Sequence, residues 1–199
     1  MKILIPTMLT PEQVAPQIAA IRAVTPDNDV FASCLQASAS VNRNACLDQI
    51  AVDDIAIMLD DDIEGFYPGW VGDLLVGLTI PNAVMVSARL LNPDGSFGPT
   101  CSRCHAREPM EIEVKSNGEA ILPTAAIAFH NRGHVFDPVY VGSGFEDSDW
   151  CHQYLASDPN AVFVQSNRCK LIHANLMRGQ KGDNWKNNRA HFERKWHVR

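Results

Sequence analysis

The segment that most constrains the fold is the run from Ile55 to Leu59, in which every residue is apolar. A strand without polar residues on either side is expected at the centre of a sheet that is covered on both faces. Asp60, Asp61 and Asp62 follow directly. The sequence therefore predicts a buried central strand with concentrated negative charge at its carboxyl end.

Strand and helix patterns alternate through the first half of the chain. Short apolar runs predict strands at 3–5, 30–32, 55–59 and 84–86. Thr10 can cap a helix with Pro11 in its first turn and Gln13 at the capping-box position. Further helices are expected at 40–50 and from Pro68 onward. This order predicts an α/β layered sheet.

The second half of the chain shows a different pattern. Residues 111–115 alternate in polarity and are followed by Asn117-Gly118 and the apolar run 120–122, which together indicate a hairpin. Further strands are expected at 125–129, 162–164 and 171–172. The length of 199 residues suits a single domain.

The three consecutive aspartates form a candidate metal site. If the chain stays extended, Asp60 and Asp62 point to one side and Asp61 to the other. Two like charges ~4 Å apart repel by about 4 kcal/mol at an effective dielectric of ~20. A hard divalent cation such as Mg²⁺ would relieve that repulsion and leave positions open for phosphate. A solvated acidic turn is the alternative interpretation.

A second acidic cluster follows a Gly-x-Gly turn, with Glu146, Asp147 and Asp149 placed just before an apolar helical pattern. Carboxylates in the first turn of a helix are favoured by its dipole, which is a purely structural explanation. The functional hypothesis makes one of them a general base. His173 ends the apolar run Leu171-Ile172 and is either a structural histidine or a nitrogen ligand suited to Mn²⁺ or Mg²⁺.

The charge is divided unevenly along the chain. The net charge of −6 combines −13 in residues 1–167 with +7 in residues 168–199. An acidic body suits a divalent cation, and a basic tail suits phosphate. The tail could close as a lid over a phosphate-bearing ligand, bind nucleic acid through its basic residues and tryptophans, or form a solvated helix.

Cysteines and the N-terminus bear on the compartment. The beginning of the chain is interrupted by Pro6 and Pro11 too early for an export signal, and no apolar run approaches ~20 residues. We therefore expect a cytoplasmic protein without a transmembrane segment, with reduced cysteines. Cys101, Cys104 and His105 could contribute to a zinc site, but their spacing matches no standard zinc finger.

Taken in order, these motifs resemble family-2-type glycosyltransferases of the GT-A fold. The resemblance rests on five stretches and a tail: Ile3-Leu4-Ile5-Pro6-Thr7, Ser40-Val41-Asn42-Arg43-Asn44, Leu59-Asp60-Asp61-Asp62, the segment from Phe136 to Asp149, His173, and the stretch from Asn188 to Trp196. It implies a three-layer α/β/α fold with a mixed, mostly parallel sheet. It further implies a single domain 1–199, divided into a nucleotide-sugar-binding half 1–92, an acceptor-side half 93–173 and a basic tail 174–199.

The resemblance also implies an activity, namely transfer of a sugar from a UDP- or GDP-sugar to a saccharide or other hydroxyl acceptor, with inversion at the anomeric carbon of the sugar. Asp62, Asp60 and His173 would hold Mn²⁺ or Mg²⁺ on the donor pyrophosphate, with Asp60 alternatively on the ribose. Asp147 would be the base and Glu146 would hold the acceptor. Thr7, Arg43, Asp60 and Asp61 would bind the donor.

One departure from the family concerns the nucleobase. The family usually carries an acidic residue after the second strand, whereas residues 32–36 here contain none. A catalytically inactive GT-A-like protein that binds an anionic glycan or nucleic acid is therefore an alternative. A nucleotidyltransferase, which shares the α/β architecture and metal carboxylates, is another.

Overall fold

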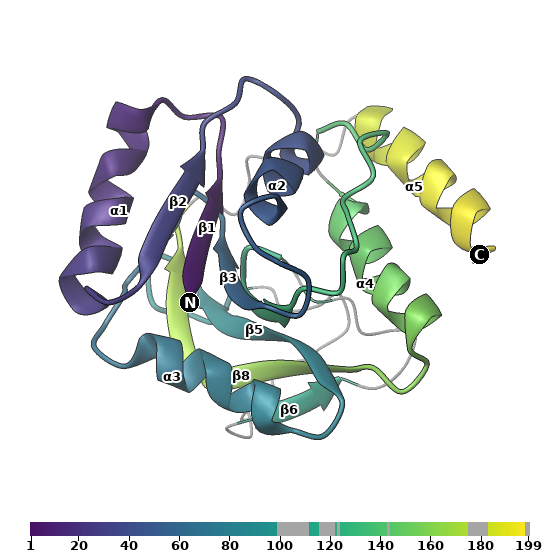
Figure 1. The fold of residues 1–199 in the computed structure, drawn as a ribbon. Coiled ribbons are helices and arrows are strands. Elements are labelled where there is room, and N and C mark those ends of the chain that lie inside the picture. The colour runs from purple at the N-terminus through teal and green to yellow at the C-terminus, as the bar shows by residue number, and fades with distance from the viewer. Residues whose placement is uncertain (99–111, 116–121, 123, 143, 175–182, 198–199) are drawn as a thin grey trace.

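The structure is a computed structural model that describes residues 1–98, 112–115, 122, 124–142, 144–174 and 183–197. Its central layer is one mixed sheet of eight strands (Figure 1). Seven strands lie in the order β2 (Asp29–Ser33), β1 (Lys2–Pro6), β3 (Ile55–Leu59), β7 (Ala126–His130), β5 (Ala83–Leu91), β8 (Val162–His173) and β4 (Ile63–Glu64). The remaining strand, β6 (Ile112–Lys115), pairs with β8 outside this path.

The strand directions place several carboxyl ends at one edge of the sheet. Strands β1, β2 and β3 are parallel neighbours, and β5 is parallel to β8. Because β7 is antiparallel to both β3 and β5, these five strands all run in one direction. The residues that follow β1, β3 and β8 therefore lie along the same edge, where open α/β sheets bind ligands.

Helices cover both faces of the sheet, as the sequence predicts. Side chains of α1 (Pro11–Val24) and α3 (Trp70–Leu75) pack on one face, and α3 continues into the 3₁₀ helix η1 (Val76–Thr79). Side chains of α2 (Ala39–Leu47) and α4 (Glu146–Ser157) pack on the other face. The last helix, α5 (Asp183–Trp196), lies beside α4 rather than on the sheet (Figure 1). This is a three-layer α/β/α arrangement.

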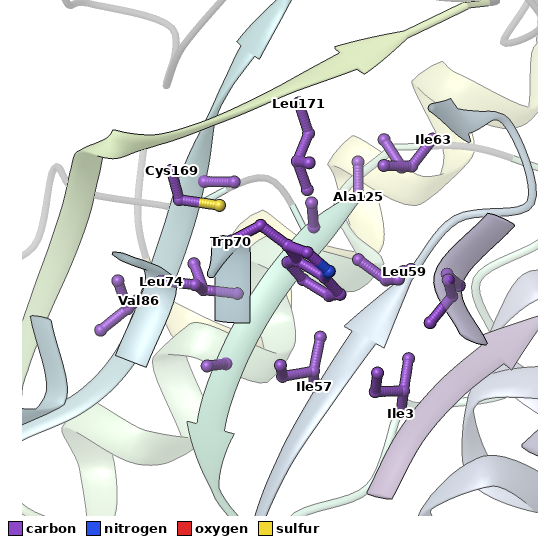
Figure 2. Close-up of a cluster of buried hydrophobic side chains, with 14 of the residues drawn as sticks. Ile3, Ile57, Leu59, Ile63, Trp70, Leu74, Val86, Ala125, Cys169 and Leu171 are labelled. Atoms are coloured by element: carbon purple, nitrogen blue, oxygen red, sulfur yellow. The ribbon is translucent and has the colours of Figure 1, made fainter. Parts of the chain in front are cut away.

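The core on the α1 and α3 face fixes the strand that carries the aspartates. Figure 2 shows Trp70 of α3 among Ile57, Leu59 and Leu74, all of them fully buried. Burial of one such side chain stabilises the fold by roughly 1.5–3 kcal/mol. Because Leu59 is held in this core, the position of the polar residues that follow it is also fixed.

In the first half of the chain, the capping box and the apolar strand pattern predict the observed elements correctly. Helix α1 begins at Pro11, and Gln13 Oε1 accepts from the Thr10 N–H at 2.9 Å, as expected of a capping box. The strand β3 lies between β1 and β7 and is buried except for its first residue. The two-residue strand β4 was not expected, because two residues carry no detectable period.

The second half agrees with the predicted elements only in part. Strand β6 forms where expected and pairs with β8, while residues 116–121, which carry most of the rest of the expected hairpin, lie outside the described residues. The runs 162–164 and 171–172 belong to one strand, β8, because its pairing with β5 resumes after a shift between Ser166 and Lys170. Polar residues between two apolar runs concealed this continuity.

Within the described ranges, no helix combines the length and the apolar character that crossing a membrane would require.

Candidate functional site

The turn after β3 carries the three aspartates and is held by main-chain contacts. The Asp60 N–H donates to the Ala125 carbonyl at 2.7 Å, and the Ile63 N–H donates to the Asp60 carbonyl at 3.3 Å. From α1, the Gln17 amide donates to the Asp60 carbonyl at 2.8 Å and to the Ile63 carbonyl at 3.1 Å. Helix α1 therefore braces both sides of the turn.

The aspartate side chains diverge as expected, although the chain turns instead of remaining extended. Asp60 and Asp62 gather with His173, whereas Asp61 accepts a hydrogen bond from the Thr7 hydroxyl at the end of β1. Thr7 is only 3% exposed, and its hydroxyl also accepts from the Leu9 N–H at 2.9 Å. The pair of Thr7 and Asp61 thus ties the end of β1 to the aspartate turn.

Strand pairing determines the place of His173. In the antiparallel pair of β4 and β8, Ile63 stands opposite His173, and the Ala174 N–H donates to the Asp62 carbonyl at 2.9 Å. His173 Nε2 then lies 3.0 Å from Asp62 Oδ1. Burial lowers the pKa of His173, but the hydrogen bond and the charge of Asp62 outweigh burial and raise it overall.

These three side chains suit a divalent cation. One ligand atom from each of Asp60, Asp62 and His173 lies within 4.8 Å of the other two, and all three residues are half-buried. His173 Nδ1 is buried and has no hydrogen-bond partner among the described residues. Two carboxylates and one imidazole form a donor set that suits Mn²⁺ or Mg²⁺. The residues predicted as metal ligands are therefore brought together.

Arg43 links this cluster to a second group of carboxylates. The residue lies on α2, and its side chain is 7% exposed. One terminal nitrogen is 3.2 Å from Asp60 Oδ1 and the other is 3.2 Å from Glu146 Oε1. Burial lowers the pKa of the Arg43 guanidinium, but Asp60 and Glu146 outweigh burial and raise it. Arg43 therefore stays charged and holds two distant acidic residues together.

The first turn of α4 supplies the second acidic group, which contains Glu146, Asp147 and Asp149. Phe145 precedes the helix with φ at 72°, a left-handed conformation that costs a non-glycine residue roughly 1–3 kcal/mol. Glu146 is buried and Asp147 is half-buried. Burial and the neighbouring Glu146 raise the pKa of Asp147 to about 7, although Arg43 opposes the rise. Asp147 can therefore exchange a proton near neutral pH.

The residues on either side of Arg43 also have structural partners, which the sequence did not reveal. The buried Asn42 amide bonds Ser33 Oγ at 2.9 Å and both main-chain groups of Leu35 at 3.0 Å, which closes the loop after β2. The Asn44 amide forms two 2.8 Å bonds with the main chain of Phe136. The signal available in the sequence was the concentration of asparagines in a short helix facing the core.

Asp149 has different contacts from Glu146 and Asp147, the other two members of this acidic group. It is fully buried, with Lys195 Nζ at 2.9 Å and the Trp196 indole N–H at 2.7 Å. Lys195 also lies 3.0 Å from Asp137. Part of the positive charge of the tail therefore holds α5 on α4. The stretch 175–182, which contains the rest of the expected lid, lies outside the described residues.

In the described part of the chain, no cysteine belongs to the group of Asp60, Asp62 and His173. Cys34, Cys46, Cys151 and Cys169 are free thiols. Cys101, Cys104 and His105, the residues considered for zinc, lie outside the described residues.

Comparisons by sequence give no family, since no family model and no curated protein matches the chain. Solved structures match over almost its whole length. The structure of GalNAc-T7 with UDP, GalNAc and Mn²⁺ has a TM-score of 0.58 and 12% identity, and the match covers 98% of this chain. The present chain spans 41% of that relative.

Two further structures are similar at comparable levels. A Drosophila β-galactosyltransferase 7 mutant in complex with manganese, UDP-Gal and xylobiose has a TM-score of 0.55 and 14% identity, with coverage of 94% of this chain and 77% of that one. A mycobacterial protein has a TM-score of 0.61 and 12% identity, with coverage of 100% and 75%. At these identities the matches show the fold alone, and that fold is the one of GT-A glycosyltransferases.

Proposed function

We propose that this protein is a metal-dependent glycosyltransferase that moves a sugar from a UDP- or GDP-sugar to an acceptor hydroxyl, with inversion. The main support is the contact of one guanidinium with both acidic groups. Arg43 lies 3.2 Å from Asp60, one of the three candidate metal ligands, and 3.2 Å from Glu146, in the first turn of α4. Transfer in a single site requires the residues that bind the donor and those that bind the acceptor to be neighbours, and Arg43 connects the two groups.

On the donor side, Asp60, Asp62 and His173 would hold Mn²⁺ or Mg²⁺. The bound cation would offset the negative charge that develops on the leaving nucleoside diphosphate. GalNAc-T7 and the galactosyltransferase, whose folds are similar, were solved with manganese and UDP or UDP-Gal. Thr7 and Asp61 lie at the same edge of the sheet and would line the donor. Arg43 keeps Asp60 in place while the site fills.

On the acceptor side, Asp147 would remove the proton from the attacking hydroxyl. A carboxylate with a pKa of about 7 is a stronger base than an ordinary aspartate and is still largely ionised at slightly alkaline pH. Glu146 is buried beside it, its Oε2 has no hydrogen-bond partner in the described part of the chain, and it would accept a hydrogen bond from the acceptor. The acceptor thus meets one carboxylate that orients it and one that deprotonates it.

The direct test is metal-dependent nucleotide binding by the intact chain. UDP or GDP together with Mn²⁺ should raise the melting temperature, and neither component alone should raise it as much. Asp62→Asn should abolish the joint effect. Asp53→Asn is a matched control, because Asp53 is 74% exposed and pairs only with Arg132 among the described contacts.

The second step is turnover with a panel of nucleotide-sugars. Metal-dependent release of the nucleoside diphosphate, lost in Asp147→Asn while nucleotide binding persists, would support the division of roles. Equal loss of binding in Asp62→Asn and Asp147→Asn would contradict it. A salt-sensitive shift with polyanions and none with nucleotide and metal would instead indicate a binding protein. Release of pyrophosphate from a nucleoside triphosphate would indicate a nucleotidyltransferase.

A further inference from the structure

The amide of Asn188 on α5 bonds main-chain atoms in the segment that leads into α4. Its Nδ2 donates to the carbonyls of Val141 and Gly144, each at 3.0 Å. The Val141 N–H donates to its Oδ1 at 3.4 Å. Asn188 is 4% exposed. A short amide that uses both ends on main-chain groups, away from water, fixes the path of the segment it bonds.

This segment needs such support, because its backbone is unusual. Gly142, Gly144 and Phe145 have φ values of 74°, 104° and 72°, all in the left-handed region. Phe145 is the residue immediately before Glu146 and Asp147. A left-handed non-glycine residue persists only where its surroundings determine it. The orientation of the first turn of α4 therefore depends on contacts made by the residues before it.

Aromatic packing from the same helix completes the support. Trp185 lies so close to Gly144 that a Cβ added there would come within 2.7 Å of the indole ring. The Phe145 ring lies 5.3 Å from the Trp185 ring and 5.4 Å from the Phe192 ring, measured between centroids. At its other end α5 is held by Lys195 and Trp196 on the buried Asp149. Helix α5 thus contacts α4 on both sides of Asp147.

We propose that Asn188 is a positioning residue for the reaction, holding the turn before α4 so that Glu146 and Asp147 face the acceptor. This role rests on the proposed glycosyltransferase function. The hydrogen bonds that Asn188 makes within the described residues reach neither the group of Asp60, Asp62 and His173 nor Asp147. Loss of Asn188 should therefore affect the transfer step and leave donor binding unchanged. This gives the basic tail a task in catalysis that does not require it to close over the donor.

The test compares Asn188→Ala with Asn187→Ala, since Asn187 is the exposed neighbour on the same helix. In Asn188→Ala, kcat should fall by about tenfold or more while the affinity for UDP with Mn²⁺ stays within about twofold. Asn187→Ala should match the wild type in both. Amide hydrogen exchange at 141–149 should accelerate by about tenfold in Asn188→Ala and remain unchanged in β3.

Two outcomes would overturn the role of Asn188. One is an unchanged kcat with unchanged exchange at 141–149. The other is a parallel loss of donor affinity and kcat with faster exchange throughout the sheet, which describes a merely structural residue. Asn188→Ser, which keeps a hydroxyl for one carbonyl, replaces the alanine variant if that one fails to fold, with the same expectations at a smaller amplitude. If the wild type shows no turnover, the proposed function fails and the exchange comparison alone decides whether Asn188 holds the turn.

Discussion

Arg43 and Glu146, 103 positions apart in the chain, form a buried ion pair with a separation of 3.2 Å. Each side chain is 7% exposed. The opposite nitrogen of the guanidinium contacts Asp60, so the pair joins α2, the aspartate turn and α4. This contact holds the aspartate turn and the first turn of α4 next to each other.

Removing the guanidinium should destabilise the protein. Arg43→Ala leaves Glu146 buried without its cation, which costs on the order of 3–5 kcal/mol in comparable buried pairs. The double variant Arg43→Ala with Glu146→Gln should recover part of that loss, because Glu146 is then no longer a buried unpaired charge, and Asp60, which also loses its partner, is 29% exposed. Urea unfolding of the two single variants and the double variant measures the coupling. Strict additivity of the single losses would show that the ion pair is energetically unimportant.

The raised pKa of Asp147 predicts the pH dependence of activity. A base must be ionised, so kcat/KM should rise with pH and level off above an apparent pKa near 7. An ordinary aspartate, with a pKa of 3.8, would give a flat profile from pH 5 to pH 8. Initial rates in buffers of constant ionic strength and metal concentration provide the measurement.

The same shift predicts a change in stability of opposite sign to that of most acidic residues. Between pH 3.8 and about pH 7, the ordinary and the raised pKa of Asp147, the folded protein keeps a proton on Asp147 that the unfolded chain has released. The contribution of Asp147 to the free energy of unfolding therefore falls as the pH rises through this window. Asp147→Asn should gain stability over the wild type above pH 7 and lose that advantage near pH 4. Urea midpoints at several pH values test this, with Asp53→Asn expected to parallel the wild type.

Gln17 should affect metal affinity although it is not one of the three candidate ligands. Its amide holds the carbonyls of Asp60 and Ile63 on either side of the aspartate turn. Groups that orient metal ligands typically change affinity 10–100-fold when removed. Gln17→Ala should therefore weaken Mn²⁺ binding by about tenfold in calorimetric titration. Gln49→Ala, at an exposed position after α2, should bind Mn²⁺ with the affinity of the wild type. Equal affinities in the two variants would show that Gln17 does not support the metal site.

The buried Asp149 should control the attachment of α5. Asp149→Asn removes the charge that Lys195 meets at 2.9 Å, and hydrogen bonds to charged groups contribute about 1.5–3 kcal/mol. Faster tryptic cleavage within α5 and a lower melting temperature are expected. Glu193→Gln is the control, because its pair with Arg189 is an exposed i,i+4 pair worth ~0.3–0.5 kcal/mol. Similar losses in the two variants would argue against a special role for Asp149.

The local signals of the sequence were sufficient for much of the fold. The apolar strand 55–59, the capping box at Thr10 and Gln13, and the alternation of strands and helices each depend on residues close together in the chain. The aspartates after β3 and the histidine at the end of β8 could be identified as candidate metal ligands for the same reason. The pairing of β6 with β8 was not predictable from the sequence, because strand pairing is decided by distant partners, here residues of β8 about fifty positions away.

The sequence alone determined which residues are candidates for metal and acid–base chemistry and at which strand or helix ends they stand, since periodicity and capping are local properties. Only the tertiary structure decided how these residues meet. The register of β4 with β8 brings His173 to Asp62, and the layer of α2 between sheet and solvent brings Arg43 to Asp60 and Glu146. Such contacts depend on packing between elements far apart in the chain, for which no short-range pattern exists.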